Sequence, residues 1–204
     1  MGGYDLSDYY TSPELSFFKE REMVMVMKQV LQGLKYLHEM DVIHKDVKPE
    51  NIRILPNPFA EDDNYLEVKL YDYGLSEFKD RRSGSLQGTP YFIAPELYWL
   101  KSDEDSGLDI YPNRRKDYDE KIDIWSLGIT LFELLSGKTP QKLLHIKTFD
   151  YKYMRDLSNL HDRMGEWSSD LKDFCLKMLQ LNPSKRPSAA DLSEFPIFNS
   201  MSNL

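Results

Sequence analysis

Apolar residues recur at helical spacing between positions 20 and 39. Successive steps of four, three, four and three residues separate Met23, Met27, Val30, Leu34 and Leu37. Such steps place side chains on one face of a helix, so this segment predicts an amphipathic helix with one buried stripe. The helix leads into a short apolar pair, Val42–Ile43, and then into a dense run of polar residues.

Residues 122–135 follow a different pattern, because their nine large apolar residues are spread so that almost no polar face remains. A stretch without a polar face predicts a helix that is buried on all sides, and Gly137 suits its C-terminal cap. A further amphipathic helix is predicted after Ser168, with Pro183 ending it, and a last helix is predicted near Ser188. The apolar stripe of the helix after Ser168 consists of Leu171, Phe174, Cys175 and Met178.

Two short apolar runs, residues 52–55 and 66–71, predict the strands of a hairpin. Pro56, Pro58 and the acidic residues 61–63 lie between the runs. Prolines and clustered charges interrupt regular structure, so this part of the hairpin is expected to form an enlarged tip.

The other segments are polar or irregular. Residues 76–88 lack periodicity and predict an exposed, mobile segment, while residues 101–115 predict an irregular insertion. Neither segment has the composition of a linker, and the chain contains no internal repeat. We therefore expect one helix-rich domain with a small hairpin over residues 1–204.

Composition narrows the classes of protein that remain. Hydrophobic residues make up 41% of the 204 residues, which is enough for a packed core, but the longest apolar runs are too short to span a bilayer. A net charge of −8 argues against nucleic-acid binding through an extensive basic surface. Cys175 is the single cysteine, and no signal peptide opens the sequence, so an intracellular location is expected.

The polar run lies at residues 44–51, directly after the first predicted helix. It consists of His44, Lys45, Asp46, Val47, Lys48, Pro49, Glu50 and Asn51. Carboxylate, ammonium and carboxamide groups crowded on a short loop favour a site where a proton acceptor, a phosphate-binding cation and a metal ligand converge. The spacing fits the pattern H-R-D-x-x-x-x-N, with Lys45 in place of arginine.

Four further blocks follow in order. They are Asp72–Gly74, at the end of the second strand, and then Gly88–Glu96, Asp123–Gly128 and Lys185–Pro187. Together with the loop, this order resembles the C-terminal lobe of the eukaryotic protein kinases over nearly the whole chain. The resemblance implies a mainly α fold, the helical C-terminal lobe of the protein kinase fold, with a small β-hairpin beside the catalytic loop. Residues 1–204 would then be a partial kinase domain of hinge and C-terminal lobe.

The resemblance also implies a chemical role for individual residues. Asp46 would orient the substrate hydroxyl and accept its proton, and Lys48 would steady the γ-phosphate of ATP. Asn51 and Asp72 would hold Mg²⁺, and Thr89 would bridge Asp46 and Lys48 and select Ser or Thr substrates. The implied catalytic residues are Asp46, Lys48, Asn51 and Thr89, and the implied metal ligands are Asn51 and Asp72. Residues 1–6 resemble the hinge. The implied cofactor-binding residues are therefore Met1, Asp5, Lys48, Asn51 and Asp72.

Other matching residues have supporting roles in the family. Asp123 resembles the buried carboxylate that holds the loop backbone near His44, and Tyr73 resembles the residue that stacks on His44. Glu96 and Arg186 resemble a buried ion pair.

The sequence departs from the family pattern at two informative positions. Lys45 keeps the charge of the usual arginine but loses its bidentate grip on a phosphate. Ser85 stands where the family often takes an activating phosphate, and Ser83 is a weaker candidate. Because Lys45 would grip such a phosphate less well than arginine, activation through Ser85 is expected to be weaker or unnecessary. Arg53 stands where the family usually places an aliphatic residue under the adenine.

The expected function is a serine/threonine kinase that uses ATP and Mg²⁺ on protein substrates. Residues 1–204 contain no glycine-rich loop, strand lysine or helix glutamate of a kinase N-terminal lobe. We therefore expect a chain truncated at the hinge, with very weak nucleotide binding alone, and with an N-terminal lobe or regulatory partner as a further partner. The alternative is a non-catalytic pseudokinase or half-kinase that acts as a protein-binding module.

Overall fold

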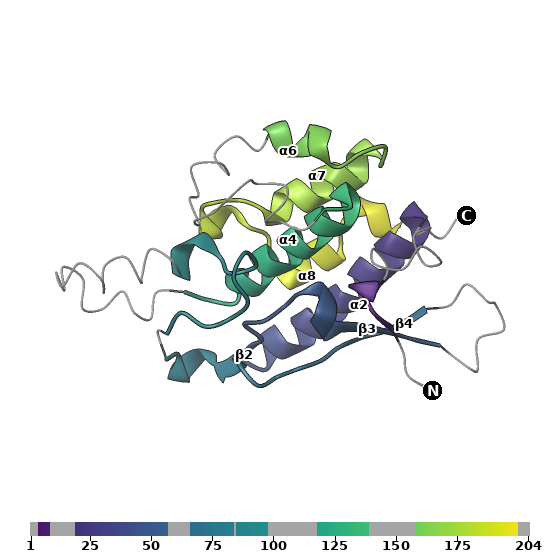
Figure 1. Cartoon of the computed structure of the whole chain (residues 1–204). Coiled ribbons are helices and arrows are strands. Elements are labelled where there is room, and N and C mark those ends of the chain that lie inside the picture. Colours follow the sequence, from purple (N-terminus) through teal and green to yellow (C-terminus); the bar gives the residue numbers. More distant parts are fainter. Residues whose placement is uncertain are drawn as a thin grey trace.

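The computed structural model describes residues 4–8, 19–56, 66–83, 85–97, 118–138 and 158–199. Helix α2 (Glu20–Glu39) lies at the centre of this part of the chain and confirms the first predicted helix. It contacts strand β4 (Leu66–Leu70) on one side and helix α8 (Ala189–Ser193) on the other. Figure 1 shows the resulting arrangement, with the strands below α2 and the other helices above it.

The predicted hairpin is present, although residues 57–65 of its tip lie outside the described part. Strands β3 (Ile52–Pro56) and β4 pair antiparallel, with Ile52 opposite Leu70. A third strand, β1 (Tyr4–Asp5), adds to the other edge of β3. The side-chain amide of Gln29 in α2 bonds to the backbone of β4 at Leu66 O (2.7 Å) and Val68 N (2.9 Å), and so it covers an edge that has no strand partner among the described residues.

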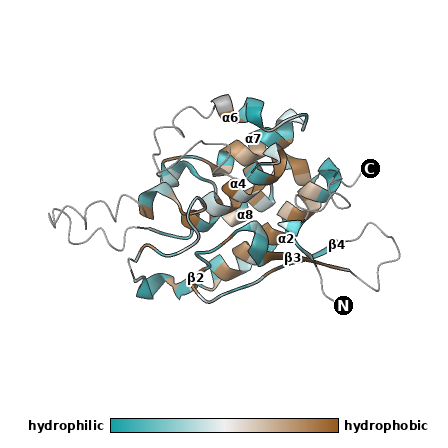
Figure 2. Cartoon of the chain, viewed as in Figure 1, coloured by the Kyte–Doolittle hydropathy of each residue, from teal (hydrophilic) through white to brown (hydrophobic). Residues whose placement is uncertain are grey.

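Helix α4 (Lys121–Ser136) is buried along nearly its whole length, as its apolar sequence predicts. Gly137 ends it with a φ of 65°, a left-handed conformation that glycine adopts without steric cost. Helix α7 (Ser169–Met178) packs against α4 and begins at Ser168, whose hydroxyl accepts the N–H of Leu171. Figure 2 shows the hydrophobic residues gathered on α2, α4 and β3.

Of the two helix boundaries predicted near the C-terminal end, the end of α7 is wrong and the start of α8 is confirmed. Helix α7 ends at Met178, so the prediction that Pro183 ends it is wrong by several residues. Pro183 instead begins a short 3₁₀ turn, Pro183–Lys185. Helix α8 confirms the predicted last helix, and the hydroxyl of Ser188 caps its first turn. A short helix, α6 (Ser158–Arg163), precedes α7.

A second small sheet joins the loop region to the segment after the hairpin. Strand β2 (Val42–Ile43) pairs antiparallel with β5 (Glu77–Phe78), so that Ile43 lies opposite Glu77. The described residues of the segment 76–88 are half-buried or exposed, in line with the predicted exposure, and residues 77–81 form β5 and a 3₁₀ turn at Lys79–Arg81. The predicted insertion at residues 101–115 lies outside the described residues.

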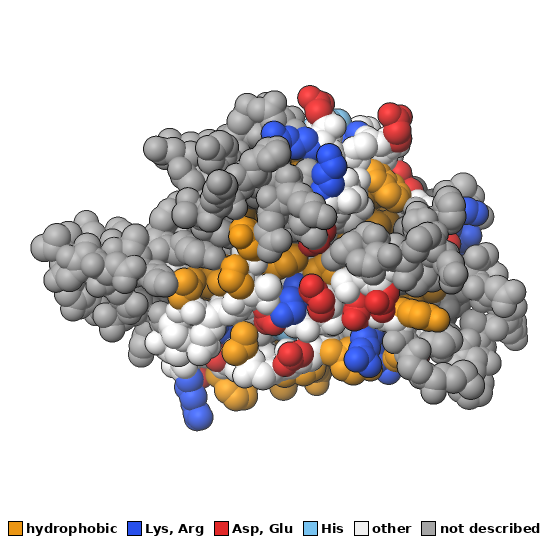
Figure 3. Space-filling view, viewed as in Figure 1, with side chains coloured by type: hydrophobic (Ala, Val, Ile, Leu, Met, Phe, Trp, Pro, Cys, Tyr) orange, Lys and Arg blue, Asp and Glu red, His pale blue; other side chains and the backbone are white. Residues whose placement is uncertain are grey.

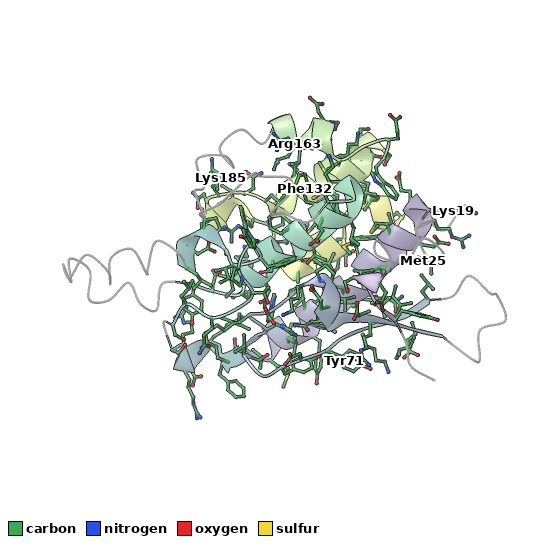
Figure 4. All side chains as sticks on the ribbon, in the orientation of Figure 1. Lys19, Met25, Tyr71, Phe132, Arg163 and Lys185 are labelled. Carbon is green, nitrogen blue, oxygen red and sulfur yellow. The ribbon has the colours of Figure 1, made fainter. Side chains whose placement is uncertain are left out.

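The described part is predominantly helical with two small sheets, in agreement with the predicted fold class. Its hydrophobic core joins α2, α4 and α7, and Figure 4 shows Phe132 of α4 among these helices while Tyr71 lies at the lower edge, after β4. Among the described helices, none is both long and apolar enough to cross a membrane.

Candidate active site

Loop 44–51 is fixed at its start by one buried carboxylate. Asp123, in the first turn of α4, accepts the backbone N–H of His44 and that of Lys45, each at 2.8 Å, and contacts Nε2 of His38 at 2.9 Å. Lys45 has a φ of 70°, a conformation that costs a non-glycine residue about 1–3 kcal/mol. The hydrogen bond from its N–H to Asp123 helps to hold that backbone, which turns Asp46 toward the segment around Thr89.

Asp46 is the residue on which the predicted site converges. One of its carboxylate oxygens accepts the N–H (2.9 Å) and the hydroxyl (2.7 Å) of Thr89. The other oxygen accepts from Nζ of Lys48 (2.8 Å) and Nδ2 of Asn51 (3.0 Å). Burial acts to raise the pKa of Asp46, but the hydrogen bonds and charge of Lys48 and the hydrogen bonds of Thr89 outweigh it and lower the pKa. Asp46 is therefore ionised at neutral pH.

The predicted bridge between Asp46 and Lys48 is present. Nζ of Lys48 lies 2.6 Å from Oγ1 of Thr89, while the Thr89 hydroxyl in turn donates to Asp46. The threonine thus contacts both the carboxylate and the ammonium group. Lys48 keeps 19% of its side chain exposed, which leaves its charge accessible from solvent. Figure 3 shows acidic and basic side chains side by side in the middle of one face of the molecule.

Asn51 contacts Asp46 directly, whereas the Asp72 carboxylate makes no hydrogen bond with Asp46, Lys48 or Asn51; both side chains offer oxygen ligands. Asn51 donates Nδ2 to the backbone oxygen of Asp46 (2.8 Å), and its amide oxygen accepts no hydrogen bond from the described residues. The backbone oxygen of Asn51 accepts the N–H of Tyr71 (2.8 Å), which brings the residue before Asp72 next to the loop. The exposed carboxylate of Asp72 accepts the N–H of Gly74 (3.1 Å) and makes no ion pair within the described part.

These two side chains fit a hard divalent cation. Amide and carboxylate oxygens are the ligands that Mg²⁺ takes, usually one or two from protein and the rest from water and phosphate. No group of three or more His, Cys, Asp and Glu residues suited to a metal occurs in the described ranges. An ion held by Asn51 and Asp72 would need further ligands, such as water or phosphate oxygens.

Tyr73, directly after Asp72, packs against His44, as the resemblance implies. The ring of Tyr73 lies 5.1 Å from that of His44, at an angle of 58°, and the Tyr73 hydroxyl donates to the backbone oxygen of Leu70. Nε2 of His44 contacts the backbone oxygen of Tyr71 at 3.0 Å. These contacts tie the segment after β4, which carries Asp72, to the loop that carries Asp46.

The predicted nucleotide residues near the N-terminus are less closely joined to the site. Asp5 lies in β1 opposite Arg53, and its carboxylate accepts hydrogen bonds from the backbone of Ser7 and Asp8. It makes no contact with loop 44–51 through its side chain among the described residues. Met1 lies outside the described residues. The guanidinium of Arg53 lies 5.3 Å from the ring centre of Tyr71, on the exposed side of the sheet.

The predicted pair of Glu96 and Arg186 is also present. Nη1 and Nη2 of Arg186 bond the two carboxylate oxygens of Glu96 at 2.6 and 2.8 Å, and the guanidinium lies 4.9 Å from the ring centre of Trp125. Arg186 is 1% exposed, so its charge depends on this partner. The pair joins the segment after Thr89 to the C-terminal helices.

Sequence reasoning missed two neighbours of the loop. His38, at the end of α2, contacts the same oxygen of Asp123 that accepts the backbone N–H of His44. Glu77, in β5, forms an ion pair with Lys45 at 3.1 Å. A strand of two residues has no measurable period, so the pattern of residues 76–88 contains no signal for this pairing.

Comparisons with known proteins agree with the geometry. The family described as "Protein kinase domain" matches residues 1–198. "Serine/threonine-protein kinase 10" of Danio rerio is 34% identical over 186 residues, which is 90% of this chain and 17% of that protein. "Meiosis-specific serine/threonine-protein kinase mek1" of Schizosaccharomyces pombe is 32% identical over 201 residues, which is 96% of this chain and 41% of that protein. The chain thus spans less than half the length of these two curated relatives.

Proposed function

This chain belongs to the protein kinase domain family, and from that premise we propose that residues 1–204 form the hinge and C-terminal lobe of a serine/threonine kinase. The proposed reaction is transfer of the γ-phosphoryl group of ATP to a Ser or Thr hydroxyl of a protein substrate. The observation that carries the proposal is the convergence of Lys48, Asn51 and Thr89 on the ionised carboxylate of Asp46.

Asp46 would act on the substrate hydroxyl. An ionised carboxylate is an acceptor only, so it can orient a hydroxyl group and take its proton as the oxygen attacks phosphorus. Thr89 and Asn51 fix the direction of the carboxylate by donating to different oxygens. Because the pKa of Asp46 is lowered, the group stays available as a base throughout the neutral range.

Lys48, Asn51 and Asp72 would act on the phosphate side of the reaction. Lys48 would place its ammonium group on the γ-phosphate, where it offsets negative charge. Asn51 and Asp72 would hold Mg²⁺ through their oxygens. A bound Mg²⁺ neutralises charge on the phosphate oxygens and aligns them for in-line transfer.

Thr89 supports the choice of substrate class. Its hydroxyl sits between Asp46 and Lys48, so it occupies the space beside the base and favours the approach of a short aliphatic hydroxyl. The names of the two relatives agree with this choice, since both are named serine/threonine-protein kinases.

Replacing the base tests the proposal. In the protein that carries this chain, Asp46→Asn keeps the shape of the side chain but removes the charge, so phosphoryl transfer from labelled ATP to Ser- and Thr-containing peptides should fall by about 100-fold or more. Asp41→Asn is the matched control, because Asp41 is an exposed loop aspartate with a φ of 57° that asparagine tolerates well. It should keep full activity.

Circular dichroism and the urea midpoint of both variants would show that the fold is retained. Transfer by Asp46→Asn at the rate of the unaltered protein would contradict the proposed role of Asp46. A wild-type protein that binds partners but transfers no phosphate would favour the alternative of a binding module.

A further inference from the structure

Lys45 has a buried cationic side chain that none of the proposed steps uses. The side chain is 0% exposed, and its Nζ lies 3.1 Å from Oε1 of Glu77, 3.3 Å from Oε1 of Gln87 and 5.6 Å from the ring centre of Tyr118. Glu77 is its one ion-pair partner among the residues that the structure describes. A buried ammonium group without a counter-charge is strongly unfavourable, so the pair with Glu77 accounts for the burial of Lys45.

Glu77 is held in place from several directions. The backbone N–H and the hydroxyl of Ser83 both bond its Oε2, each at 3.1 Å, and the hydroxyl of Tyr118 donates to its Oε1. The pairing of β5 with β2 sets Glu77 opposite Ile43, two residues before Lys45. Burial acts to raise the pKa of Glu77, but hydrogen bonds from Tyr118 and Ser83 and the charge of Lys45 outweigh it and lower the pKa.

The segment that begins at Glu77 ends at the proposed base. At its far end Thr89 bonds Asp46, and the preceding Gly88 has a φ of 120° and no room for a side chain, because a Cβ there would lie 2.9 Å from the backbone oxygen of Lys45. Within residues 77–89, Glu77, Ser83 and Gln87 contact Lys45, and Thr89 contacts Asp46 and Lys48. Glu77 supplies the one charged contact among these.

We infer that Glu77 is a positioning residue, which serves as the resident anion for Lys45 and holds residues 77–89 against loop 44–51 without a phosphate group. This inference rests on the proposed function only for its effect on catalysis. It goes beyond the identification of the site, because Glu77 touches none of the reacting groups and acts through Lys45 and the segment that ends at Thr89.

Ser85 lies close enough to Glu77 for a phosphate there to affect the Lys45–Glu77 pair. Oγ of Ser85 lies 2.6 Å from Oγ of Ser83, which donates to Glu77. A phosphate on Ser85 would bring two further negative charges next to the Glu77 carboxylate and compete with it for Lys45. Phosphorylation of Ser85 should therefore loosen the segment, whereas the resemblance implies only that the family often takes an activating phosphate at this position and that activation here is weaker or unnecessary.

Hydrogen exchange of the present chain tests the attachment without any need for activity. Glu77→Gln keeps the size of the side chain and removes its charge, so amides of residues 77–89 should exchange about tenfold faster or more. Glu77→Asp keeps the charge with a shorter reach and should give an intermediate rate. Glu67→Gln, at a carboxylate whose lysine partner is exposed, is the matched control and should leave these rates unchanged. Amides of α4 serve as the internal reference for the fold.

Wild-type exchange rates in both Glu77 variants would overturn the inference. If Glu77→Gln unfolds the chain, which loss of protection in α4 would reveal, the Asp variant alone decides. A chain synthesised with phosphoserine at position 85 should also exchange faster in residues 77–89, and slower exchange would overturn the predicted competition.

Kinetics in the protein that carries this chain test the catalytic consequence. Glu77→Gln should lower kcat for peptide phosphorylation about tenfold and change KM for ATP less than about twofold, because Glu77 acts through the orientation of Asp46 and Thr89 and contacts none of Lys48, Asn51 and Asp72 itself. Glu77→Asp should restore part of kcat. If the wild-type protein transfers no phosphate, the proposed function fails, and the exchange experiment still decides whether Glu77 holds the segment.

Discussion

Arg186 shows how strongly single residues depend on their partners in this molecule. Its guanidinium is 1% exposed and bonds Glu96 through two parallel hydrogen bonds. Nε also donates to the backbone oxygen of Gln180 at 2.7 Å, so nearly every donor of the side chain is used. A charge that is so completely enclosed cannot turn to water when its partner is removed.

Glu96→Ala should therefore destabilise the protein by about 3–5 kcal/mol, because it leaves the Arg186 charge buried and unpaired. The free energy of unfolding in urea measures the effect. Glu67→Ala is the control, since Glu67 pairs with Lys69 in solvent and such pairs contribute about 0–1 kcal/mol. Equal losses in the two variants would contradict the assignment of a buried, dependent charge.

Contacts between single residues can be predicted from the sequence only where both residues belong to a recognisable motif. The bridge of Lys48 and Thr89 to Asp46 is predicted and present, because each residue stands in a block of characteristic composition. The pair of Lys45 and Glu77 could not be predicted, since it depends on a two-residue strand and on the buried Tyr118 beyond it. The chemical roles of these residues remain proposals.

Helices α4 and α7 pack closely at a glycine. A Cβ added to Gly128 in α4 would lie 2.8 Å from Cβ of Met178 and 2.9 Å from Cδ2 of Leu179. Real Cβ atoms do not approach so closely, so the helices would have to move apart. Gly33 in α2 differs, because a Cβ there meets no atom within 4 Å.

These two glycines form a matched test of helix packing. Gly33→Ala should stabilise the protein by about 0.5–1 kcal/mol, which is the gain in helix propensity alone. Gly128→Ala receives the same gain but also overpacks the contact with α7, so it should destabilise by about 1–3 kcal/mol. Thermal or urea unfolding of both variants measures the difference in the free energy of unfolding. Stabilisation by Gly128→Ala would show that Met178 and Leu179 can move away from position 128 at little cost.

The long helices are predictable from sequence, and the ends and short strands are not. Helices α2 and α4 extend over enough turns for apolar spacing to be decisive. After α7 ends at Met178, the backbone oxygens of Gln180 and Leu181 are required as acceptors for Arg186. That requirement is tertiary, so the local sequence cannot show it.

At the scale of the whole molecule, the candidate site lies where the strands meet the helices. Asp123 of α4 holds one end of loop 44–51, while β2 and β5 bring Glu77 to the other side of Lys45. Two of the carboxylates at this junction, Asp46 and Glu77, have pKa values below their usual 3.8 and 4.5. The stability of the whole fold should therefore depend on pH through this junction.

The direction of that dependence follows from proton binding. A carboxyl group whose pKa is lower in the folded state binds fewer protons there than in the unfolded chain at mildly acidic pH, so acid favours unfolding. The stabilisation from Asp46 and Glu77 is fully present above their unfolded pKa values, at about pH 5 and higher. It is lost as the pH falls through the folded pKa values.

Urea unfolding at pH 7, 5, 4 and 3.5 tests this prediction, with wild type compared with Glu77→Gln at each pH. The difference in the free energy of unfolding should be largest at pH 7 and 5, and it should shrink at pH 4 and below, because the wild-type carboxyl group then loses the charge that the variant never has. Glu77→Asp keeps a titrating carboxyl group beside Lys45 and should retain the steep acid dependence. A difference between wild type and Glu77→Gln that stays constant over this range would mean that Glu77 stabilises the junction by its shape and not by its charge.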